Sequence, residues 1–158
     1  MNLLYNHEKV KALVSFTKGE GYGRPIAEFI TTGKPVIVSG WSGHIDFVNP
    51  AFHTYLDGEL KVIDKSAVWQ GILNEGSRWF NVNYPKAAET LRDVHKKYKN
   101  YLSNSKKSVK EIEVKWSYER MRENFGDLLT KYLPEFAERV QLKLPTLKKL
   151  PTLKKVEE

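Results

Sequence analysis

The sequence predicts an α/β fold, with a parallel sheet followed by C-terminal helices. Two short apolar runs, at residues 12–16 and 34–39, have the composition of strands that are buried on both faces. A glycine-rich turn and a helical segment separate them. Because parallel strands need a crossover connection of this kind, the order strand, turn, helix, strand indicates a βαβ unit.

Proline and glycine delimit the helix of this unit. Arg24 and Pro25 open it, since proline in the first turn of a helix removes no intrahelical hydrogen bond. Gly33 is expected to close it as a C-cap, because glycine readily adopts the left-handed conformation that ends many helices.

Shorter elements are predicted beyond the second apolar run. We expect a loop at residues 40–43, a short helix at residues 44–48 and a turn at Asp57-Gly58. Residues 59–63 then have the pattern of a third strand.

Helices dominate the C-terminal half of the chain. From residue 85 to residue 102, apolar side chains recur at three- to four-residue spacing, which indicates an amphipathic helix. Residues 103–110 are polar and predict a break. A last helix is expected to begin near Ser117, a good N-cap residue, with its apolar stripe in the core. That stripe consists of Tyr118, Met121, Phe125, Leu128, Leu129, Tyr132 and Phe136.

One domain and a tail account for the whole length. Residues 1–137 fit a single domain, and residues 138–158 are interpreted as an extended basic tail. The tail repeats Leu-Pro-Thr-Leu-Lys-Lys at residues 144–149 and 150–155, and each proline blocks a continuous helix. A docking peptide is the alternative interpretation of this repeat.

Composition excludes several classes of protein. Apolar residues make up 41 % of the 158 residues, which suffices for a packed core and excludes a wholly disordered chain. The absence of cysteine excludes disulfides and thiolate metal sites. No apolar run approaches the ~20 residues that span a bilayer, and the N-terminal residues lack the pattern of a signal peptide. We therefore expect a soluble, cytoplasmic protein.

The chain is basic, with 26 Lys and Arg against 19 Asp and Glu and a formal charge of +7. Solvated helix faces and a basic tail explain the excess, and we expect no specific nucleic-acid partner because no nucleic-acid motif is present. Two groups hold much of this charge, one of Lys96, Lys97, Lys99, Lys106, Lys107 and Lys110 and one of Lys143, Lys148, Lys149, Lys154 and Lys155.

The glycine-rich turn at residues 18–23 is the candidate binding segment. Its glycines allow a tight turn and a close approach of the backbone to a ligand, and the helix that follows presents unpaired N–H groups to a phosphate. Glu20 lies in the turn and Glu28 lies about one helical turn beyond it. Carboxylates accept hydrogen bonds from sugar hydroxyls, so the combination suggests a nucleotide-sugar site.

The same segment resembles a known family. Residues 20–28 resemble the E-x7-E motif of retaining glycosyltransferases with the GT-B fold, in the family called glycosyl transferases group 1. Residues 32–39 resemble the helix end and strand that follow this motif, and residues 42–48 resemble the family's Gly-Gly-x-x-Glu-x-Val stretch, from which Ser42 and Asp46 depart. The resemblance is close over residues 12–64 and looser up to residue 137.

This resemblance implies a fold and a set of roles. The fold would be a partial Rossmann-like parallel sheet, the C-terminal donor-binding domain of a GT-B enzyme, and the donor substrate would be a nucleotide diphosphate sugar without a metal or other cofactor. Glu20 would act as the catalytic residue that contacts the transferred sugar, and Glu28 would bind the ribose hydroxyls. The other binding positions would be Gly21, Tyr22, Gly23 and Gly43.

Structural roles are the alternative for the same residues. Glu20 could be a solvent-exposed loop acid, and Glu28 a solvated helix residue. His44 is expected to begin a helix rather than to act as a base. Trp41 could stack on a base or sugar or serve only in packing.

GT-B enzymes have two Rossmann-like domains, and the resemblance covers part of the second. We therefore expect the chain to be N-terminally truncated relative to the family, without the acceptor domain and without the arginine and lysine that contact the donor diphosphate. Activity of the chain alone is accordingly not expected. The sheet should have an open edge and an uncovered apolar face, which favours self-association or a separate polypeptide carrying the missing half.

Three functions remain open from the sequence. The chain could be the donor-binding part of a retaining glycosyltransferase, or a non-catalytic binding or assembly module that keeps this fold. It could also be a general nucleotide-binding α/β domain that uses the glycine turn for another phosphate ligand.

Overall fold

A three-stranded parallel sheet forms the centre of the fold. The computed structural model describes residues 1–134, and its sheet has the strand order β1 (Leu13–Ser15), β2 (Val36–Ser39), β3 (Thr54–Leu56). Every residue of the central strand β2 is buried. The protein is therefore a mixed α/β fold with a small parallel sheet, as the two apolar runs predict.

Both faces of β2 contribute to the core, because successive side chains of a strand point to opposite faces. Val36 and Val38 pack with Ile26, Phe29 and Ile30 of α2 (Arg24–Ile30). The short helix α1 (Asn2–Asn6) covers the same side.

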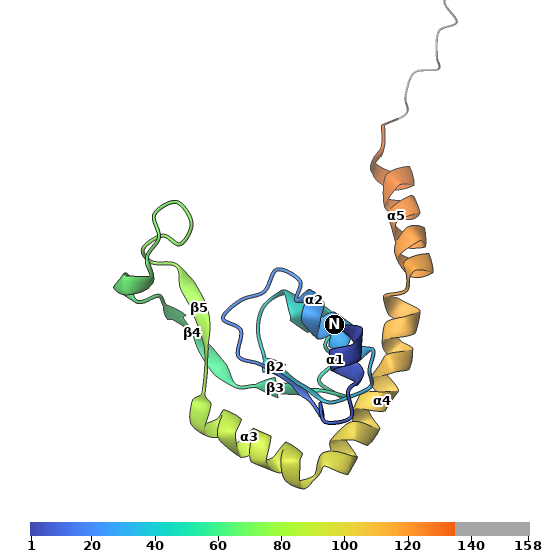
Figure 1. Cartoon of the computed structure of the whole chain (residues 1–158). Helices are drawn as coiled ribbons and strands as arrows, with labels where there is room; N and C mark the ends of the chain where they lie inside the picture. The colour runs from blue at the N-terminus through green and yellow to red at the C-terminus, as the bar shows by residue number, and fades with distance from the viewer. Residues whose placement is uncertain (135–158) are drawn as a thin grey trace, which may run out of the picture.

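The opposite face of β2 packs against α3 (Tyr84–Lys96). Ile37 lies there in a cluster with Leu56, Ala87 and Val94. Figure 1 shows α3 on one side of the sheet and α1 with α2 on the other. Among the described residues β1 pairs only with β2, so it forms an edge of the sheet, and its Val14 is partly exposed.

The predicted helix after the glycine turn is confirmed, although it ends earlier than expected. Pro25 occupies the first turn of α2, and the C-cap is Thr31, not Gly33. Gly33 has a φ of 68° and donates its N–H to the carbonyl of Ile30 at 2.9 Å. Its left-handed conformation therefore turns the chain toward β2 after the helix has already ended.

The third strand predicted at residues 59–63 belongs to another sheet. The third parallel strand is β3, and β4 (Gly58–Val62) pairs antiparallel with β5 (Arg78–Val82), which the sequence analysis did not predict. The short helix η2 (Lys65–Ala67) lies in the connection between β4 and β5. Figure 1 shows this β4–β5 hairpin projecting from the body of the molecule.

Close backbone packing starts the hairpin. A Cβ atom on Gly58 would lie 2.3 Å from the carbonyl oxygen of Asn81, so only glycine fits there. The chain therefore leaves the parallel sheet at Asp57-Gly58 and enters the antiparallel hairpin. The backbone N–H of Phe80 donates to the carbonyl of Lys18 at 3.0 Å, which ties the hairpin to the loop after β1.

The break predicted at residues 103–110 is wrong, because α4 (Tyr98–Lys115) runs through it. The helices α3 and α4 instead meet at Lys97. Within α4, the hydroxyl of Ser105 donates to the carbonyl of Tyr101 and that of Ser108 to the carbonyl of Ser105. Serine can therefore occupy the buried side of this helix, because its hydroxyl bonds to the helix backbone.

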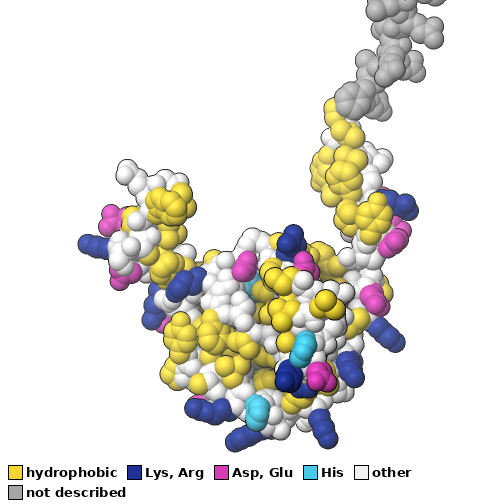
Figure 2. Space-filling view, in the orientation of Figure 1, with side chains coloured by type: hydrophobic (Ala, Val, Ile, Leu, Met, Phe, Trp, Pro, Cys, Tyr) yellow, Lys and Arg dark blue, Asp and Glu magenta, His cyan; other side chains and the backbone are white. Residues whose placement is uncertain are grey.

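The last helix begins where the sequence predicts, but its stripe is not in the core. Ser117 caps α5 (Tyr118–Tyr132) by accepting a hydrogen bond from the backbone N–H of Arg120 at 3.1 Å. Figure 1 shows α5 extending away from the sheet, and Figure 2 shows apolar side chains along it. Six stripe residues are 39–68 % exposed: Tyr118, Met121, Phe125, Leu128, Leu129 and Tyr132. The seventh, Phe136, lies outside the described residues, as does the predicted tail.

The composition also led to expectations about the lysines and about membrane-spanning helices. The six lysines predicted to lie on solvated helix faces, from Lys96 to Lys110, are all exposed. Across residues 1–134, none of the helices combines the length and the apolar character that a bilayer crossing requires.

A buried histidine joins the start of β3 to α4. Nε2 of His53 lies 3.0 Å from Oγ of Ser108, whose own hydrogen is donated to Ser105, so Nε2 carries a proton and donates it. Nδ1 is buried and has no hydrogen-bond partner within residues 1–134. Burial lowers the pKa of His53 from 6.5 to about 4, against a smaller opposing effect of Glu111.

This pKa predicts a loss of stability in mild acid. Between pH 6.5 and about 4 the unfolded chain protonates His53 while the folded protein does not, so the free energy of unfolding should fall as the pH falls through this window. The loss should be on the order of 2–3 kcal/mol, and His53→Gln should flatten the slope. Urea unfolding at several pH values measures it. The variant His95→Gln, at an exposed position, should keep the wild-type dependence of the free energy of unfolding on pH. An unchanged dependence in His53→Gln would contradict its assignment to His53.

Candidate functional site

The loops that follow β1 and β2 meet beyond the carboxyl ends of these strands. In a parallel sheet these loops leave from the carboxyl ends of the strands, where α/β proteins bind ligands. The first loop contains residues 19–23, the elbow, and the second contains Ser42 and Gly43. Oγ of Ser42 accepts from the backbone N–H of Glu20 and donates to its carbonyl, each at 2.7 Å, and the N–H of Gly43 donates to the same carbonyl at 3.0 Å.

Gly43 is required by its contact with the elbow. A Cβ atom at this position would lie 1.9 Å from the carbonyl oxygen of Gly21 and 3.0 Å from that of Glu20. No side chain fits this gap, because real Cβ atoms do not approach so closely. Gly43 was expected to be a binding position, and in the structure it holds its loop against the backbone of the elbow.

Ser42 adopts a conformation that normally belongs to glycine. Its φ of 93° and ψ of −177° lie in a region that costs a non-glycine residue roughly 1–3 kcal/mol. The two hydrogen bonds of its hydroxyl to Glu20 help to hold it there. Glycine would adopt this conformation without that cost, because it has no Cβ atom.

The elbow presents free backbone donors. Among residues 1–134, the N–H groups of Gly21, Tyr22 and Gly23 have no hydrogen-bond acceptor. Gly21 and Tyr22 are exposed, whereas Gly23 is buried. Gly23 is the N-cap of α2 with a φ of 83°, a left-handed conformation that favours glycine. Successive N–H groups in such a turn can form a concavity that binds an anion or a hydroxyl oxygen.

Glu28 lies in a small pocket beside Tyr22. The pocket has a volume of about 270 Å³, and the aromatic rings of Tyr22, Phe47 and Trp116 line it. The rings of Tyr22 and Phe47 have centroids 4.9 Å apart. Nε of Arg24 lies 3.2 Å from Oε1 of Glu28 in an exposed ion pair. Such a pair contributes little stability, so a ligand hydroxyl could replace it.

Glu20 lies at the elbow itself. Its side chain is half-buried, and its Cγ comes within 3.8 Å of the position that a Cβ of Gly23 would take. Glu20 does not line the pocket that contains Glu28. The structure therefore places one carboxylate at the elbow and the other in the aromatic pocket, with Tyr22 belonging to both.

The neighbouring residues have packing roles. His44 is fully buried in η1 (Gly43–Asp46), which is shorter than the predicted helix at residues 44–48, and its Nε2 lies 2.7 Å from the carbonyl of Ser39. Trp41 stacks on Phe80 with centroids 6.4 Å apart and an angle of 10° between the rings. Trp41 therefore has a packing role, and its stacking on a ligand stays a prediction.

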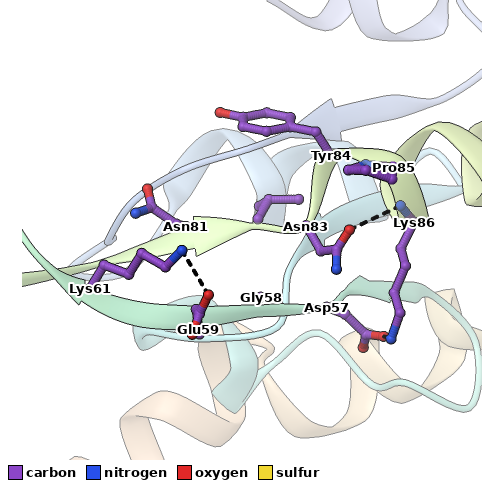
Figure 3. A pocket seen from close by; sticks show the side chains of 10 residues that line it. Asp57, Gly58, Glu59, Lys61, Asn81, Asn83, Tyr84, Pro85 and Lys86 are labelled. Carbon is purple, nitrogen blue, oxygen red and sulfur yellow. Dashed lines mark hydrogen bonds and ion pairs between the residues drawn. The ribbon is translucent and has the colours of Figure 1, made fainter.

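A larger cavity than the Glu28 pocket lies elsewhere, where the β4–β5 hairpin meets α3. It has a volume of about 730 Å³ and is shown in Figure 3. Its lysines already have partners, since Lys61 pairs with Glu59 at 2.8 Å and Lys86 with Asp57 at 3.1 Å. Because the lysines here are already paired, this cavity is a weaker candidate than the elbow.

Sequence analysis missed several residues that shape these sites. The aromatic pair Phe47 and Trp116 comes from segments far apart in the chain, so no local signal identifies it. Within residues 1–134 the structure shows no group of three or more histidine or acidic side chains that could hold a metal. Comparison with protein-family models, curated proteins and solved structures gives no match for this chain.

The contact between Gly43 and the elbow can be tested with two alanine variants. Gly43→Ala should displace the elbow and lower the free energy of unfolding by about 1–3 kcal/mol, because the new methyl group has no room. Gly21→Ala is the matched control, since its Cβ would meet nothing within 4 Å. Urea unfolding and the amide NMR signals of residues 20–23 measure both effects. Equal behaviour of the two variants would refute the close contact.

Proposed function

We propose that this chain is the donor-binding part of a retaining glycosyltransferase, which transfers a sugar from a nucleotide diphosphate sugar to an acceptor. The observation that carries the proposal is the elbow, whose three free N–H groups are held in place by Ser42 and Gly43. The pocket of Glu28 lies next to it through Tyr22. N–H groups can donate to a phosphate, and the nearby carboxylate can accept from sugar hydroxyls. Together they match the diphosphate and the sugars of a nucleotide diphosphate sugar.

The elbow would bind the diphosphate or the transferred sugar. Its N–H groups belong to a backbone that the contact with Gly43 restrains, so they need little reorganisation to donate to a ligand. Glu20 lies beside them and would accept a hydrogen bond from a hydroxyl of the transferred sugar. The catalytic role of Glu20 stays a prediction from the family resemblance.

The aromatic pocket would hold the ribose. Its volume of about 270 Å³ suits a fragment of the donor rather than the whole molecule. The carboxylate of Glu28 would exchange its exposed ion pair with Arg24 for hydrogen bonds from the ribose hydroxyls. Tyr22, Phe47 and Trp116 would exclude water from the sugar ring.

Titration with nucleotide diphosphate sugars tests this proposal. Glu28→Ala should weaken binding about tenfold or more, because the ribose hydroxyls lose a charged acceptor. The exposed Glu89→Ala on α3 changes the net charge equally and should leave the dissociation constant unchanged. Isothermal titration calorimetry measures both.

Two outcomes would contradict the proposal. One is equal weakening in the two variants, which would indicate a general charge effect. The other is tighter binding of a mononucleotide without a sugar, which would favour a general nucleotide-binding domain.

An assembly module that keeps this fold is the second candidate. The exposed apolar stripe of α5 favours it, because soluble monomers rarely expose so continuous an apolar face. The helix is about 22 Å long by its 15 residues, which is long enough to pair with the same helix of a second copy.

Size-exclusion chromatography with light scattering tests association through α5. The wild-type chain should form dimers or larger species, and Phe125→Glu with Leu128→Glu should shift it toward monomer, because two charges would enter the apolar contact. Val114→Glu, at an exposed position on α4, is the control and should not change the mass. A well-folded wild-type monomer at high concentration would exclude this function.

A further inference from the structure

A second cavity lies at the base of the β4–β5 hairpin and contains three lysines. Its volume is about 480 Å³, and its polar lining includes Lys18, Lys61, Lys65, Asp64 and Asn81, with the indole of Trp79 beside them. Lys18 comes from the loop after β1, and the others come from the hairpin and its connection. No motif brings these residues together, because Lys18 and Asn81 are 63 positions apart.

Lys18 is held in a defined orientation. Its Nζ donates to Oδ1 of Asn81 at 2.8 Å and lies 4.3 Å from the ring centroid of Trp79. The ring attracts the ammonium group through a cation–π interaction. An ammonium group has three N–H donors, so two of them remain for a ligand after the bond to Asn81.

The cavity carries an excess of positive charge. Lys61 is neutralised by Glu59 at 2.8 Å. The carboxylate of Asp64 accepts from the N–H and the hydroxyl of Ser66, at 2.8 and 2.6 Å. These bonds hold the pKa of Asp64 below its usual value, so it stays charged. The three lysines against Glu59 and Asp64 leave one positive charge in excess. Lys18 and Lys65 form no ion pair within residues 1–134, and an anion between them would relieve their repulsion.

The cavity also lies on the ligand-binding side of the sheet. The hydrogen bond from Phe80 to the carbonyl of Lys18 joins the hairpin to the loop after β1, at the carboxyl end of the parallel strands. Lys18 directly precedes the elbow in the chain. A ligand bound to Lys18 would therefore contact the same loop that carries the free N–H groups of the elbow.

We infer that this cavity binds a phosphate group, with the ammonium groups of Lys18 and Lys65 as donors and the indole of Trp79 as a wall. The site uses neither Glu20 nor Glu28, so its side chains can be tested separately from those proposed to bind the sugars of the donor. The phosphate can come from the diphosphate of a nucleotide or from a second, phosphorylated substrate. Both sources present the same oxygen acceptors to the lysines.

Titration of the full chain with inorganic pyrophosphate tests the inference. Pyrophosphate should bind saturably and shift the indole NMR signal of Trp79. Lys18→Met with Lys65→Met should weaken binding at least tenfold. Lys18→Arg alone should largely keep the wild-type affinity, because the positive charge is kept. Lys96→Met with Lys99→Met removes the same charge from exposed positions on α3 and α4 and should leave the affinity unchanged.

Three results would overturn the inference: no saturable binding, equal weakening in the control pair, or a shift of other indole signals without that of Trp79. Circular dichroism and thermal unfolding of each variant ensure that only folded protein is compared. Glu28→Ala should not change pyrophosphate binding, so the two proposed sites can fail independently.

Competition identifies the source of the phosphate. If nucleotide diphosphates displace pyrophosphate with the same dependence on Lys18 and Lys65, the site receives the donor's diphosphate. If a phosphate monoester competes and nucleotide diphosphates do not, the site receives a phosphate on a second substrate. Either result supports an anion site at the base of the hairpin.

Discussion

Three hydrogen bonds to the backbone of Glu20 hold the candidate site together. Two come from the hydroxyl of Ser42 and one from the N–H of Gly43. They join the loops after β1 and β2, and the contact between Gly43 and Gly21 leaves no room for a side chain between them. Without this junction the elbow would be an unsupported surface loop, and its free N–H groups would have no defined direction. The strained backbone of Ser42 is a cost of this arrangement.

The buried strand β2 makes the junction possible. Its side chains pack against α2 on one face and α3 on the other, so its end is rigidly placed. The hairpin is attached to the same edge through Phe80 and Lys18, which brings positive charge next to the elbow. The donor site and the phosphate site would therefore share one scaffold while using different side chains. The exposed stripe of α5 forms a further surface, and its Met121, Phe125 and Leu128 line a pocket together with Tyr22 of the elbow.

Errors of the sequence analysis have identifiable physical causes. The stripe of α5 has the period of a core helix, but the period shows only that one face is apolar and not what covers it. The polar residues at 103–110 look like a break, yet Ser105 and Ser108 satisfy their hydroxyls within α4. A strand predicted at residues 59–63 forms as β4 at Gly58–Val62, but strand propensity does not specify its partner, which is β5 rather than the parallel sheet.

By itself the sequence determined the βαβ unit, the start of α2 at its proline and the start of α5 at Ser117, because each depends on residues close together in the chain. It also identified the glycine elbow and the two glutamates as candidates. Only the tertiary structure decided which groups surround them: the bracing Ser42, the aromatic pocket of Glu28 and the lysine cavity at the hairpin. These sites join segments separated by 20 to 90 residues or so, and such contacts depend on how the chain packs rather than on any local pattern.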